Sequence, residues 1–485
     1  MTKIINELEP TVVWNYFEEI CKIPRPSKKE EKIIKYLMDF AKKYKLQAKK
    51  DEIGNILISK PAVKGYENVK PVVLQSHLDM VGEKNSDTEH DFATDAIKPY
   101  IDGDWVKAKG TTLGADDGIG IATQMAILVA DDIKHGPIEC LFTVDEETGL
   151  SGAFALEDDF FESRTLINLD SEDWAELFIG CAGGRDTKAY FKFEKENVPK
   201  KSTAFEISVK GLKGGHSGDE IHKGFGNSIK LLDRLLFEAK DDFNIRISFI
   251  DGGNMRNAIP REAFAKVVVK EGKESEFIDY VNKFNSIAKN ELFVTAPDLQ
   301  IDVKKSNIPD FVIDKNTQDM LLKSLFICPH GEMAWSQNIP ELVETSTNLA
   351  TLKMDNEIIV GTSQRSSVES KLDWIVQMLS NTFELAGAEV ETTDGYPGWQ
   401  PNLKSEILEI TKKSYIKLFK EEPAVKAIHA GLECGLIGKK YPGIDMISIG
   451  PDIKGAHTPD ERINIINTKQ FWDLLLDVLE NMPKD

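Results

Sequence analysis

The sequence predicts an α/β protein with two domains: a larger domain with a central mixed, mostly parallel sheet flanked by helices, and an inserted α+β domain of the split-βαβ type. At 485 residues the chain is too long for a single hydrophobic core. Short apolar segments alternate with helical segments near both ends of the chain, which is typical of a parallel sheet. Between residues 204 and 304 the expected order becomes β-α-β-β-α-β, which indicates a separate compact unit.

The N-terminal region is expected to hold two helices and a pair of strands. Residues 11–21 show helical apolar spacing, and Ser27 followed by Glu30 is a capping-box pattern that predicts the start of the second helix. Residues 48–51 and 55–59 predict two strands joined by a tight turn.

Four later apolar segments are each followed by residues that bind metals or protons. Residues 72–81 predict a buried strand that ends at His77 and Asp79; a satisfied buried histidine beside a turn aspartate is the alternative to a site. The other segments are 137–144 before Glu146 and Glu147, 164–169 before Asp170, and 445–449 before the loop with His457. Because the carboxyl ends of parallel strands meet at one edge of a sheet, we expect these side chains to converge.

The glycine-rich segment GTTLGADDGIG, residues 110–120, precedes an apolar helix and contains Asp116 and Asp117. Its two acids disfavour a phosphate cradle, and the segment lacks the Lys-Ser/Thr pair of a P-loop. A cation site and a tight turn with an aspartate cap both fit the segment taken alone.

Taken together, the strand ends predict a site for two divalent metal ions. Imidazole and carboxylate ligands suit Zn²⁺, Co²⁺ or Mn²⁺. Two such ions about 3.5–4 Å apart can share one carboxylate and one hydroxide, and a further carboxylate can take a proton from that water. The candidate residues are His77, Asp79, Asp116, Glu146, Glu147, Asp170 and His457.

The region of residues 187–394 is predicted to form the inserted domain, and residues 1–186 and 395–485 the larger one. Helices and strands expected over 314–393 continue the inserted domain in an order that indicates a partial second copy of its β-α-β-β-α-β unit.

The composition narrows the class of protein and its partners. The chain has 80 acidic and 60 basic residues, a net charge of −20, which argues against binding nucleic acid or an anionic membrane surface. It has no apolar run of membrane-spanning length and no apolar signal core near its start. Five scattered cysteines suit a reducing compartment, so a cytoplasmic location is expected.

These motifs resemble those of a known family. HLD, LGADDG, DEETG, a strand-end aspartate and a histidine after SIGP are similar to the motifs of the co-catalytic zinc peptidases related to aminoacylase and carboxypeptidase. The aminoacyl-histidine dipeptidase branch, also called Xaa-His dipeptidase or cytosol non-specific dipeptidase, resembles this chain more closely. The segments KGGHSGDEIHKGFGNS, RNAIPREAFA, QRSSVESK, GYPGWQPN, IHAGLECG and SIGPDIKGAHTPDE extend that resemblance over nearly the whole length.

The resemblance implies a dipeptidase in which a water bridged between two metals attacks the peptide bond. It implies that Asp116 bridges the ions, with Glu146 as the general base. It gives Asp79 the task of orienting an imidazole, whereas the residues alone leave direct ligation equally open. One ion would be held by His77 and Asp170, and the other by Glu147 and His457. Asp117 departs from the family, which often has asparagine there.

The resemblance also implies that the inserted domain is a lid with substrate contacts and, by analogy, the contacts of a homodimer. His216 would stabilise the tetrahedral oxyanion, and Asn257 and Arg365 would hold the ends of the dipeptide. His429 and Glu433, in the IHAGLECG motif, are further candidates for substrate binding, with packing at a helix start as the alternative.

Other functions remain compatible with the sequence. An aminoacylase-type deacylase or a tripeptidase would use the same metal site, since Arg365 suits a free carboxylate but does not set peptide length. A non-catalytic, metal-bearing binding protein is the alternative of another class; the adjacent pair Glu146 and Glu147 argues against it, because packing requires no such pair.

Overall fold

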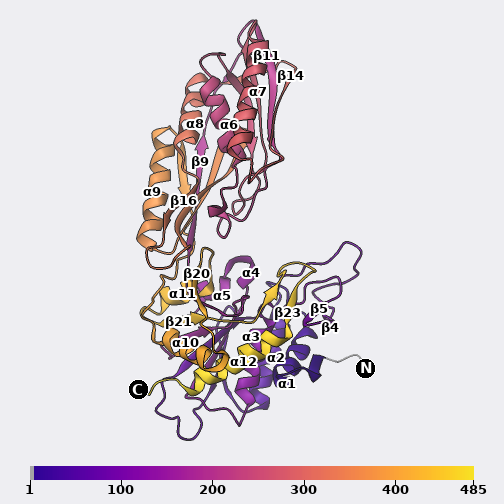
Figure 1. Cartoon of the computed structure of the whole chain (residues 1–485), viewed down its shortest axis with the longest axis vertical. Coiled ribbons are helices and arrows are strands. Elements are labelled where there is room, and N and C mark those ends of the chain that lie inside the picture. The colour runs from indigo at the N-terminus through magenta and orange to yellow at the C-terminus, as the bar shows by residue number, and fades with distance from the viewer. Residues whose placement is uncertain (1–4, 485) are drawn as a thin grey trace. The chain divides into compact units, whose positions relative to one another are not determined.

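The computed structural model describes residues 5–484, which divide into two compact units. The first unit comprises residues 1–180, 399–427 and 432–485, and the second comprises residues 181–398 and 428–431. Figure 1 shows both units, with labels on many of their helices and strands, and each unit is described below by itself.

The first unit is built on an eight-stranded sheet with a parallel centre. Strands β6, β3, β7 and β21 run parallel to one another, while β1, β2 and β8 are antiparallel to their neighbours. The prediction of a mixed, mostly parallel sheet is therefore confirmed. In spatial order the strands are β1 (Gln47–Lys50), β2 (Ile56–Lys60), β6 (Ile138–Thr143), β3 (Val72–His77), β7 (Thr165–Asn168), β21 (Asp445–Ser448), β8 (Glu176–Cys181) and β20 (Ala424–Ile428).

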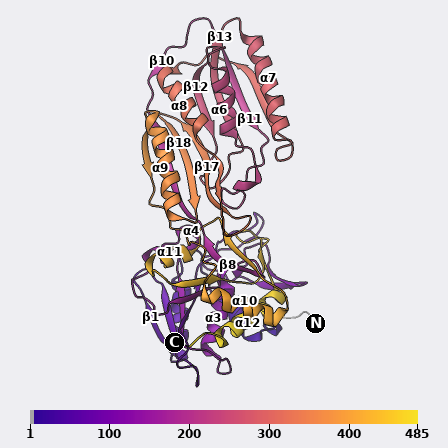
Figure 2. The ribbon, with the colours of Figure 1, turned by 60° about the vertical axis from the view of Figure 1, so that its left-hand side comes forward.

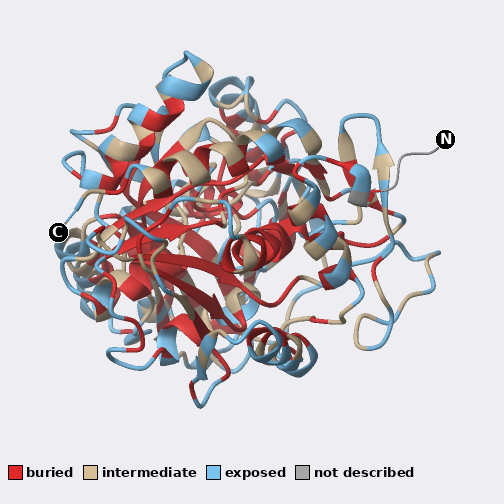
Figure 3. Ribbon diagram, turned by 90° about the horizontal axis from the view of Figure 1, so that it is seen from below, coloured by how far each residue is buried: buried red, intermediate tan, exposed pale blue. Residues whose placement is uncertain are grey.

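Helices flank this sheet and bury its central strands. Every residue of β3, β6 and β7 is buried, as expected for strands covered on both faces. In Figure 3, buried strands lie at the centre of the view, and exposed residues lie on the outer faces of the helices around them. The helices of the unit are η1 (Ile5–Glu7), α1 (Thr11–Cys21), α2 (Glu31–Lys43), α3 (Ala115–Val129), α4 (Glu146–Gly149), α5 (Ser151–Ala155), α10 (Glu406–Phe419), α11 (Glu433–Lys440) and α12 (Ile465–Glu480).

The order of the parallel strands reverses at β3. The chain passes from β3 through α3 to β6 on one side, and then to β7 on the other side of β3. In open α/β sheets such a reversal leaves room for a ligand at the carboxyl ends of the strands. His77, the last residue of β3, lies at this point.

A small four-stranded sheet was not predicted. It consists of β22 (Ile453–Lys454), β23 (Arg462–Asn464), β5 (Trp105–Ala108) and β4 (Pro99–Asp102), in that order. The loop that contains His457 connects β22 to β23, so a hairpin holds it. Strands of two to four residues are too short for a periodic apolar pattern, which explains why the sequence indicated only a loop.

The predicted capping box at Ser27 and Glu30 is wrong. Helix α2 begins at Glu31, and no side chain caps it. The Glu30 carboxylate instead accepts the backbone N–H groups of Lys28 and Asp145, at 2.9 and 3.1 Å, and the Ser27 hydroxyl bonds to Asp79. Both side chains therefore bond to groups elsewhere and do not cap the first N–H groups of α2.

The second unit contains two β-α-β-β-α-β units in one sheet (Figure 2). The first, predicted from the sequence, is β11 (Ser202–Lys210), α6 (Ser228–Ala239), β12 (Arg246–Gly252), β13 (Ala263–Lys270), α7 (Glu274–Glu291) and β14 (Gln300–Ser306). The second is β9 (Gly183–Phe191), α8 (Lys315–Ile327), β17 (Val343–Met354), β18 (Ile358–Ser366), α9 (Glu369–Leu385) and β19 (Glu389–Thr392).

The second copy is complete because its first strand, β9, precedes the whole first copy in the chain. The spatial order β14-β11-β13-β12-β17-β18-β9-β19 reads identically from both ends when each strand is replaced by its place in its copy. One buried apolar cluster contains side chains from α6, α7, α8 and α9, so all four helices pack against the same core. The remaining short elements are β10 (Lys195–Glu196), η2 (Ile221–Lys223), β15 (Val312–Ile313) and β16 (Gly331–Trp335).

Among residues 5–484, no helix combines the length and the apolar character needed to cross a lipid bilayer.

Candidate metal centre

Two groups of three potential ligands share the carboxylate of Asp116 in the first unit. In one group, Nε2 of His77 lies 2.9 Å from Oδ1 of Asp116 and 3.4 Å from Oδ1 of Asp170. In the other, Nε2 of His457 lies 3.1 Å from Oδ2 of Asp116 and 2.9 Å from Oε2 of Glu147. Each oxygen of Asp116 therefore faces a different imidazole, as a carboxylate shared by two ions would.

Glu146 and Glu147 begin the short helix α4, directly after β6 and Asp145. Ligand atoms of both glutamates and of His77 lie within 4.8 Å of one another. Asp145 adopts a left-handed conformation with φ of 50°, and its carboxylate accepts the hydroxyls of Thr148 and Ser151. The turn is thereby fixed so that both glutamates start the helix at the end of the parallel strands.

Asp79 is buried between His77 and the start of α4. Its Oδ1 lies 3.4 Å from Nδ1 of His77, and its carboxylate accepts the backbone N–H groups of Glu146 and Glu147 at 3.0 and 3.3 Å. Burial would raise the pKa of Asp79, but contacts with His77, Glu146 and Ser27 lower it to about 2. An ionised Asp79 can thus orient the imidazole and the helix start together.

Two buried charged residues that sequence reasoning missed hold the loops of the site. The guanidinium of Arg25 donates to the carbonyls of Leu78 and Asp79 at 2.9 and 2.5 Å, and to that of Gly114 at 2.5 Å. The carboxylate of Glu461 accepts four consecutive backbone N–H groups, those of residues 113–116. Neither residue ends a strand, so the strand-end argument did not point to them.

Asp117 turns away from the ligands towards the helix that follows. Its Oδ1 accepts the N–H of Gly120 at 3.0 Å, while its buried Oδ2 has no hydrogen-bond partner. A Cβ at position 120 would lie 2.4 Å from this carboxylate, so the glycine makes room for it. The aspartate cap considered for this segment therefore exists, beside the shared Asp116.

The electrostatics of the cluster favour cations. Hydrogen bonds to Asp116 and Glu147 raise the pKa of His457 to about 11. Burial raises the pKa of Asp170 to about 7 and that of Glu146 well above its usual value. So many acids in one buried place raise one another's pKa values unless positive charge lies among them.

The donor atoms fit metal ions. Oε1 of Glu147 is buried and has no hydrogen-bond partner, and a small hollow lies between Asp116, Glu147 and His457. Two imidazoles with three carboxylates form a borderline-hard ligand set that suits first-row divalent ions such as Zn²⁺, Co²⁺ and Mn²⁺. The described residues therefore offer ligands for two ions.

The second unit brings four predicted residues into two local groups. Nδ1 of His216 lies 3.2 Å from Oδ2 of Asp219, and the backbone of the neighbouring Ser217 donates to the carbonyl of Asn257 at 2.9 Å. Across β17 and β18, Arg365 pairs with Ser346, whose hydroxyl lies 2.7 Å from Nε2 of His429.

Arg365 has capacity for an anion. Its Nη1 donates to the hydroxyl of Tyr396 at 2.8 Å, whereas its buried Nε has no hydrogen-bond partner. The side chain of Asn257 is exposed. Glu433, in contrast, belongs to the first unit, where it is buried against Gln75 and Thr143.

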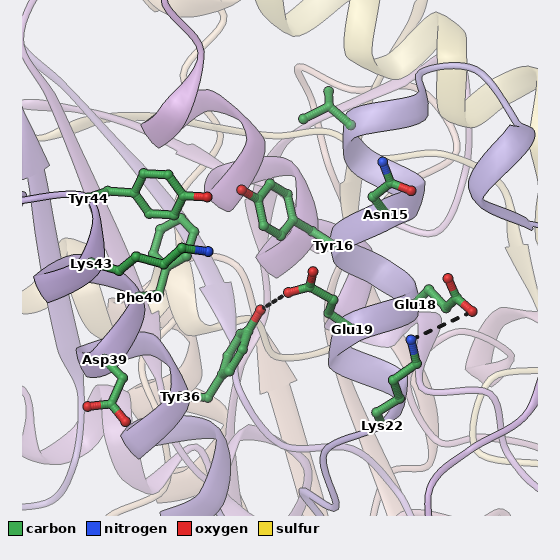
Figure 4. A pocket seen from close by; sticks show the side chains of 11 residues that line it. Asn15, Tyr16, Glu18, Glu19, Lys22, Tyr36, Asp39, Phe40, Lys43 and Tyr44 are labelled. Carbon is green, nitrogen blue, oxygen red and sulfur yellow. Dashed lines mark hydrogen bonds and ion pairs between the residues drawn. The ribbon is translucent and has the colours of Figure 1, made fainter.

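A separate hollow of about 530 Å³ lies between α1 and α2 (Figure 4). Tyr16, Tyr36, Phe40 and Tyr44 give it aromatic walls. Its polar groups bond to one another: the Tyr36 hydroxyl donates to Glu19, and Figure 4 shows the Lys22–Glu18 ion pair as a dashed line. It contains none of the metal-ligand candidates, so the acidic centre is the better candidate for a reaction site.

Known proteins resemble this chain over nearly its whole length. Residues 73–481 match the model of peptidase family M20/M25/M40. The cytosol non-specific dipeptidase of Escherichia coli (strain K12) is 43% identical over 480 residues, which is 99% of each chain.

Solved structures of other proteins also resemble this chain over nearly its whole length. Aminoacylhistidine dipeptidase from Vibrio alginolyticus superposes with a TM-score of 0.94 at 41% identity and covers 100% of this chain and 99% of its own. Aminopeptidase PepT from Bacillus cereus covers 98% of each chain with a TM-score of 0.57, and at 18% identity it shows a similar fold alone.

Proposed function

This chain belongs to peptidase family M20/M25/M40, and from that premise we propose that it is a metal-dependent dipeptidase. The identity of 43% over 480 residues with a cytosol non-specific dipeptidase supports this activity. The observation that carries the mechanism is the shared carboxylate of Asp116, which faces His77 through one oxygen and His457 through the other. A substrate of Xaa-His type or dipeptides in general would be hydrolysed there.

We assign the ions to two sites on either side of Asp116. The proposed ligands besides Asp116 are His77 and Asp170 at one site, and Glu147 and His457 at the other. Two divalent ions bound there would polarise the scissile carbonyl and lower the pKa of a water molecule. We propose Zn²⁺, and the mixed imidazole and carboxylate ligands also suit Co²⁺ and Mn²⁺.

Glu146 is the proposed general base. Its carboxylate lies within 4.8 Å of ligand atoms of His77 and Glu147, one from each group. Glu146 is itself a member of neither group around Asp116. It takes the proton from the attacking water and returns it to the leaving amine. Because burial raises its pKa, Glu146 can hold that proton between the two steps. Asp79 positions His77 and the start of α4 throughout.

For the second unit we propose substrate contacts. Arg365, with an unpartnered Nε, would bind the free carboxylate of the dipeptide. Nδ1 of His216 accepts the N–H of Asp219 at 3.2 Å, and in that arrangement the neutral imidazole carries its proton on Nε2. That proton makes His216 suitable as the donor to the oxyanion. Asn257 and His429 are proposed as further contacts.

The protein is further proposed to be a cytoplasmic homodimer. The buried thiols of Cys21, Cys140 and Cys328 form no disulfide, as suits a reducing compartment. The side chains of Phe293 and Val294 in the second unit are exposed, and exposed apolar groups of this kind occur where subunits associate. Light scattering would test this assembly, and a monomeric mass would exclude it.

A substrate panel on metal-stripped protein tests the function. We expect hydrolysis of Xaa-His and other dipeptides after addition of Zn²⁺, Mn²⁺ or Co²⁺, and none before. Preferred cleavage of tripeptides or N-acetyl amino acids would instead make the protein a tripeptidase or a deacylase. Two bound metals without hydrolysis of any of these substrates would favour a binding protein.

A further inference from the structure

The carboxylate of Glu433 is buried beneath the proposed metal centre and holds two strands together. Its Oε2 accepts the side-chain amide of Gln75 on β3 at 2.6 Å and the hydroxyl of Thr143 on β6 at 2.7 Å. The other oxygen, Oε1, has no hydrogen-bond partner, and Glu433 is 1% exposed. Such a residue is unsuited to a direct substrate contact, although the IHAGLECG motif suggested one.

The hydrogen bonds continue from Gln75 across two more parallel strands. The amide of Asn168 on β7 donates to Oε1 of Gln75 at 2.6 Å, and the hydroxyl of Ser448 on β21 donates to Oδ1 of Asn168 at 2.5 Å. Gln75, Asn168 and Ser448 are register partners, so they form one row across the sheet. Four parallel strands are therefore linked by side chains as well as by backbone.

All donors in this row point towards Glu433. Ser448 donates to Asn168, Asn168 to Gln75, and Gln75 to Glu433. Oε2 of Glu433 accepts both bonds whether or not Oε1 carries a proton, so it fixes which way the terminal amide of Gln75 faces, and that amide fixes the next. Removing Glu433 would leave Gln75 only its longer bond to Thr143, at 3.2 Å, and Thr143 only its bond to the carbonyl of Ser76, at 3.3 Å. Neither bond fixes the direction of the two amides as the carboxylate does.

The row lies directly beneath the proposed ligands. Gln75 precedes His77 by two residues on β3 and thus shares a strand face with it, and Asn168, the last residue of β7, precedes Asp170 by two. Thr143, the second donor to Glu433, is the last residue of β6 and precedes Glu146 by three. The strands that precede His77, Asp170 and Glu146 are thereby tied to a single carboxylate.

We propose that Glu433 is a positioning residue that sets the spacing of the metal ligands through this row of hydrogen bonds. The inference rests on the proposed metal centre and deepens it. It assigns Glu433 an action through Gln75 and Thr143, without contact to the substrate.

Calorimetric titration of metal-stripped protein with Zn²⁺ tests the proposal on three variants. E433A should bind Zn²⁺ about 10- to 100-fold more weakly, the range found for groups that orient metal ligands. E433Q should stay within about threefold of the wild type, because its amide oxygen can accept both bonds and its NH₂ would replace the oxygen that has no partner.

E139A is the matched control. Glu139, like Glu433, is a buried glutamate, and it lies on β6 four residues before Thr143. Its carboxylate accepts the backbone N–H groups of Glu162 and Ser163. Its loss should leave Zn²⁺ affinity unchanged in folded protein. Should E433A not fold, T143V serves instead, since it deletes one donor to Glu433 and should also weaken Zn²⁺ binding.

Kinetics give a second readout. E433A should lower kcat at saturating metal and leave KM for a dipeptide nearly unchanged, with recovery in E433Q. Unaltered Zn²⁺ affinity in E433A, or equal losses in E433Q and E433A, would show that this row of hydrogen bonds does not set the spacing of the metal ligands. A wild type that binds no Zn²⁺ would overturn the proposed metal centre itself, which is a different result.

Discussion

Glu461 holds the loop of Asp116 by accepting that residue's own backbone N–H, at 3.3 Å, with the N–H groups of Leu113, Gly114 and Ala115 at 2.7 to 2.9 Å. Four donors on one carboxylate resemble the anion site at a helix N-terminus, here at the entry to α3. The shared ligand of the proposed metal centre is thus placed by a glutamate some 345 residues further along the chain.

Replacing this glutamate should destabilise the protein. In E461Q the amide oxygen can accept only part of the bonds, and its NH₂ group faces the remaining donors, which leaves buried N–H groups unsatisfied. We expect the free energy of unfolding to fall by about 2 kcal/mol, measured by urea denaturation. D460N, at the exposed neighbouring residue, should change it by less than about 0.5 kcal/mol. Equal stabilities of E461Q and D460N would show that the loop does not depend on this carboxylate.

Glu146→Gln should separate metal binding from catalysis. The amide cannot accept the proton of the attacking water, so kcat should fall about 10²- to 10⁴-fold, the usual contribution of a general acid or base. Elemental analysis should still find the metal content of the wild type. E157Q, a change at an exposed glutamate, should keep full activity. An active E146Q would remove Glu146 from the role of base.

His457→Ala should lose one of two metal equivalents. His457 contributes to the group with Asp116 and Glu147, while the group around His77 lacks it. Inductively coupled plasma analysis of dialysed protein measures the stoichiometry. H222A, in which an exposed histidine of the second unit is replaced, should retain both equivalents. If H457A also retains both, His457 is no ligand.

The second unit should lose stability as pH rises, because of Asp233. This residue on α6 is 1% exposed, and neither carboxylate oxygen has a hydrogen-bond partner. Burial raises the pKa of Asp233 to about 8, so between the unfolded value of about 3.9 and that pH the folded state binds the extra proton. Linkage then makes stability fall with rising pH, by up to about 1.4 kcal/mol per pH unit.

D233N should flatten this dependence. An asparagine needs no proton to be neutral, so unfolding followed by circular dichroism at pH 5, 7 and 8.5 should show a smaller loss than in the wild type. D241N, an exposed change just after α6, should keep the wild-type slope. Parallel slopes in D233N and the wild type would mean that Asp233 is ionised in the folded protein.

The central sheet could be predicted from the sequence because its strands are apolar runs that end at histidine or acidic residues. His77, Glu146 and Asp170 follow such runs directly, and parallel pairing brings those ends together. The supporting residues carry no such signal. Asn168 is a single polar residue inside an apolar run, and Gln75 stands next to Ser76 at the end of another, so only the register shows that they meet.

Strands β8 and β9 escaped prediction for a related reason. The segment from Glu176 to Phe191 contains Gly180, Gly183 and Gly184, which weaken a strand pattern. The structure explains Gly184: a Cβ there would lie 2.6 Å from the hydroxyl of Tyr396, the partner of Arg365. Glycine is thus required at position 184 by a residue distant in sequence, and a local sequence pattern cannot reveal such a requirement.

The palindromic sheet of the second unit has a consequence for how such a chain can arise. One copy is interrupted after its first strand, β9, by the whole of the other copy, and it resumes at α8. The two points of interruption are adjacent, because β10 pairs with β15 and places Lys195 opposite Ile313. Entry and exit of a nested segment at adjacent points allow a whole repeat to be gained or lost in one genetic event without rethreading the chain.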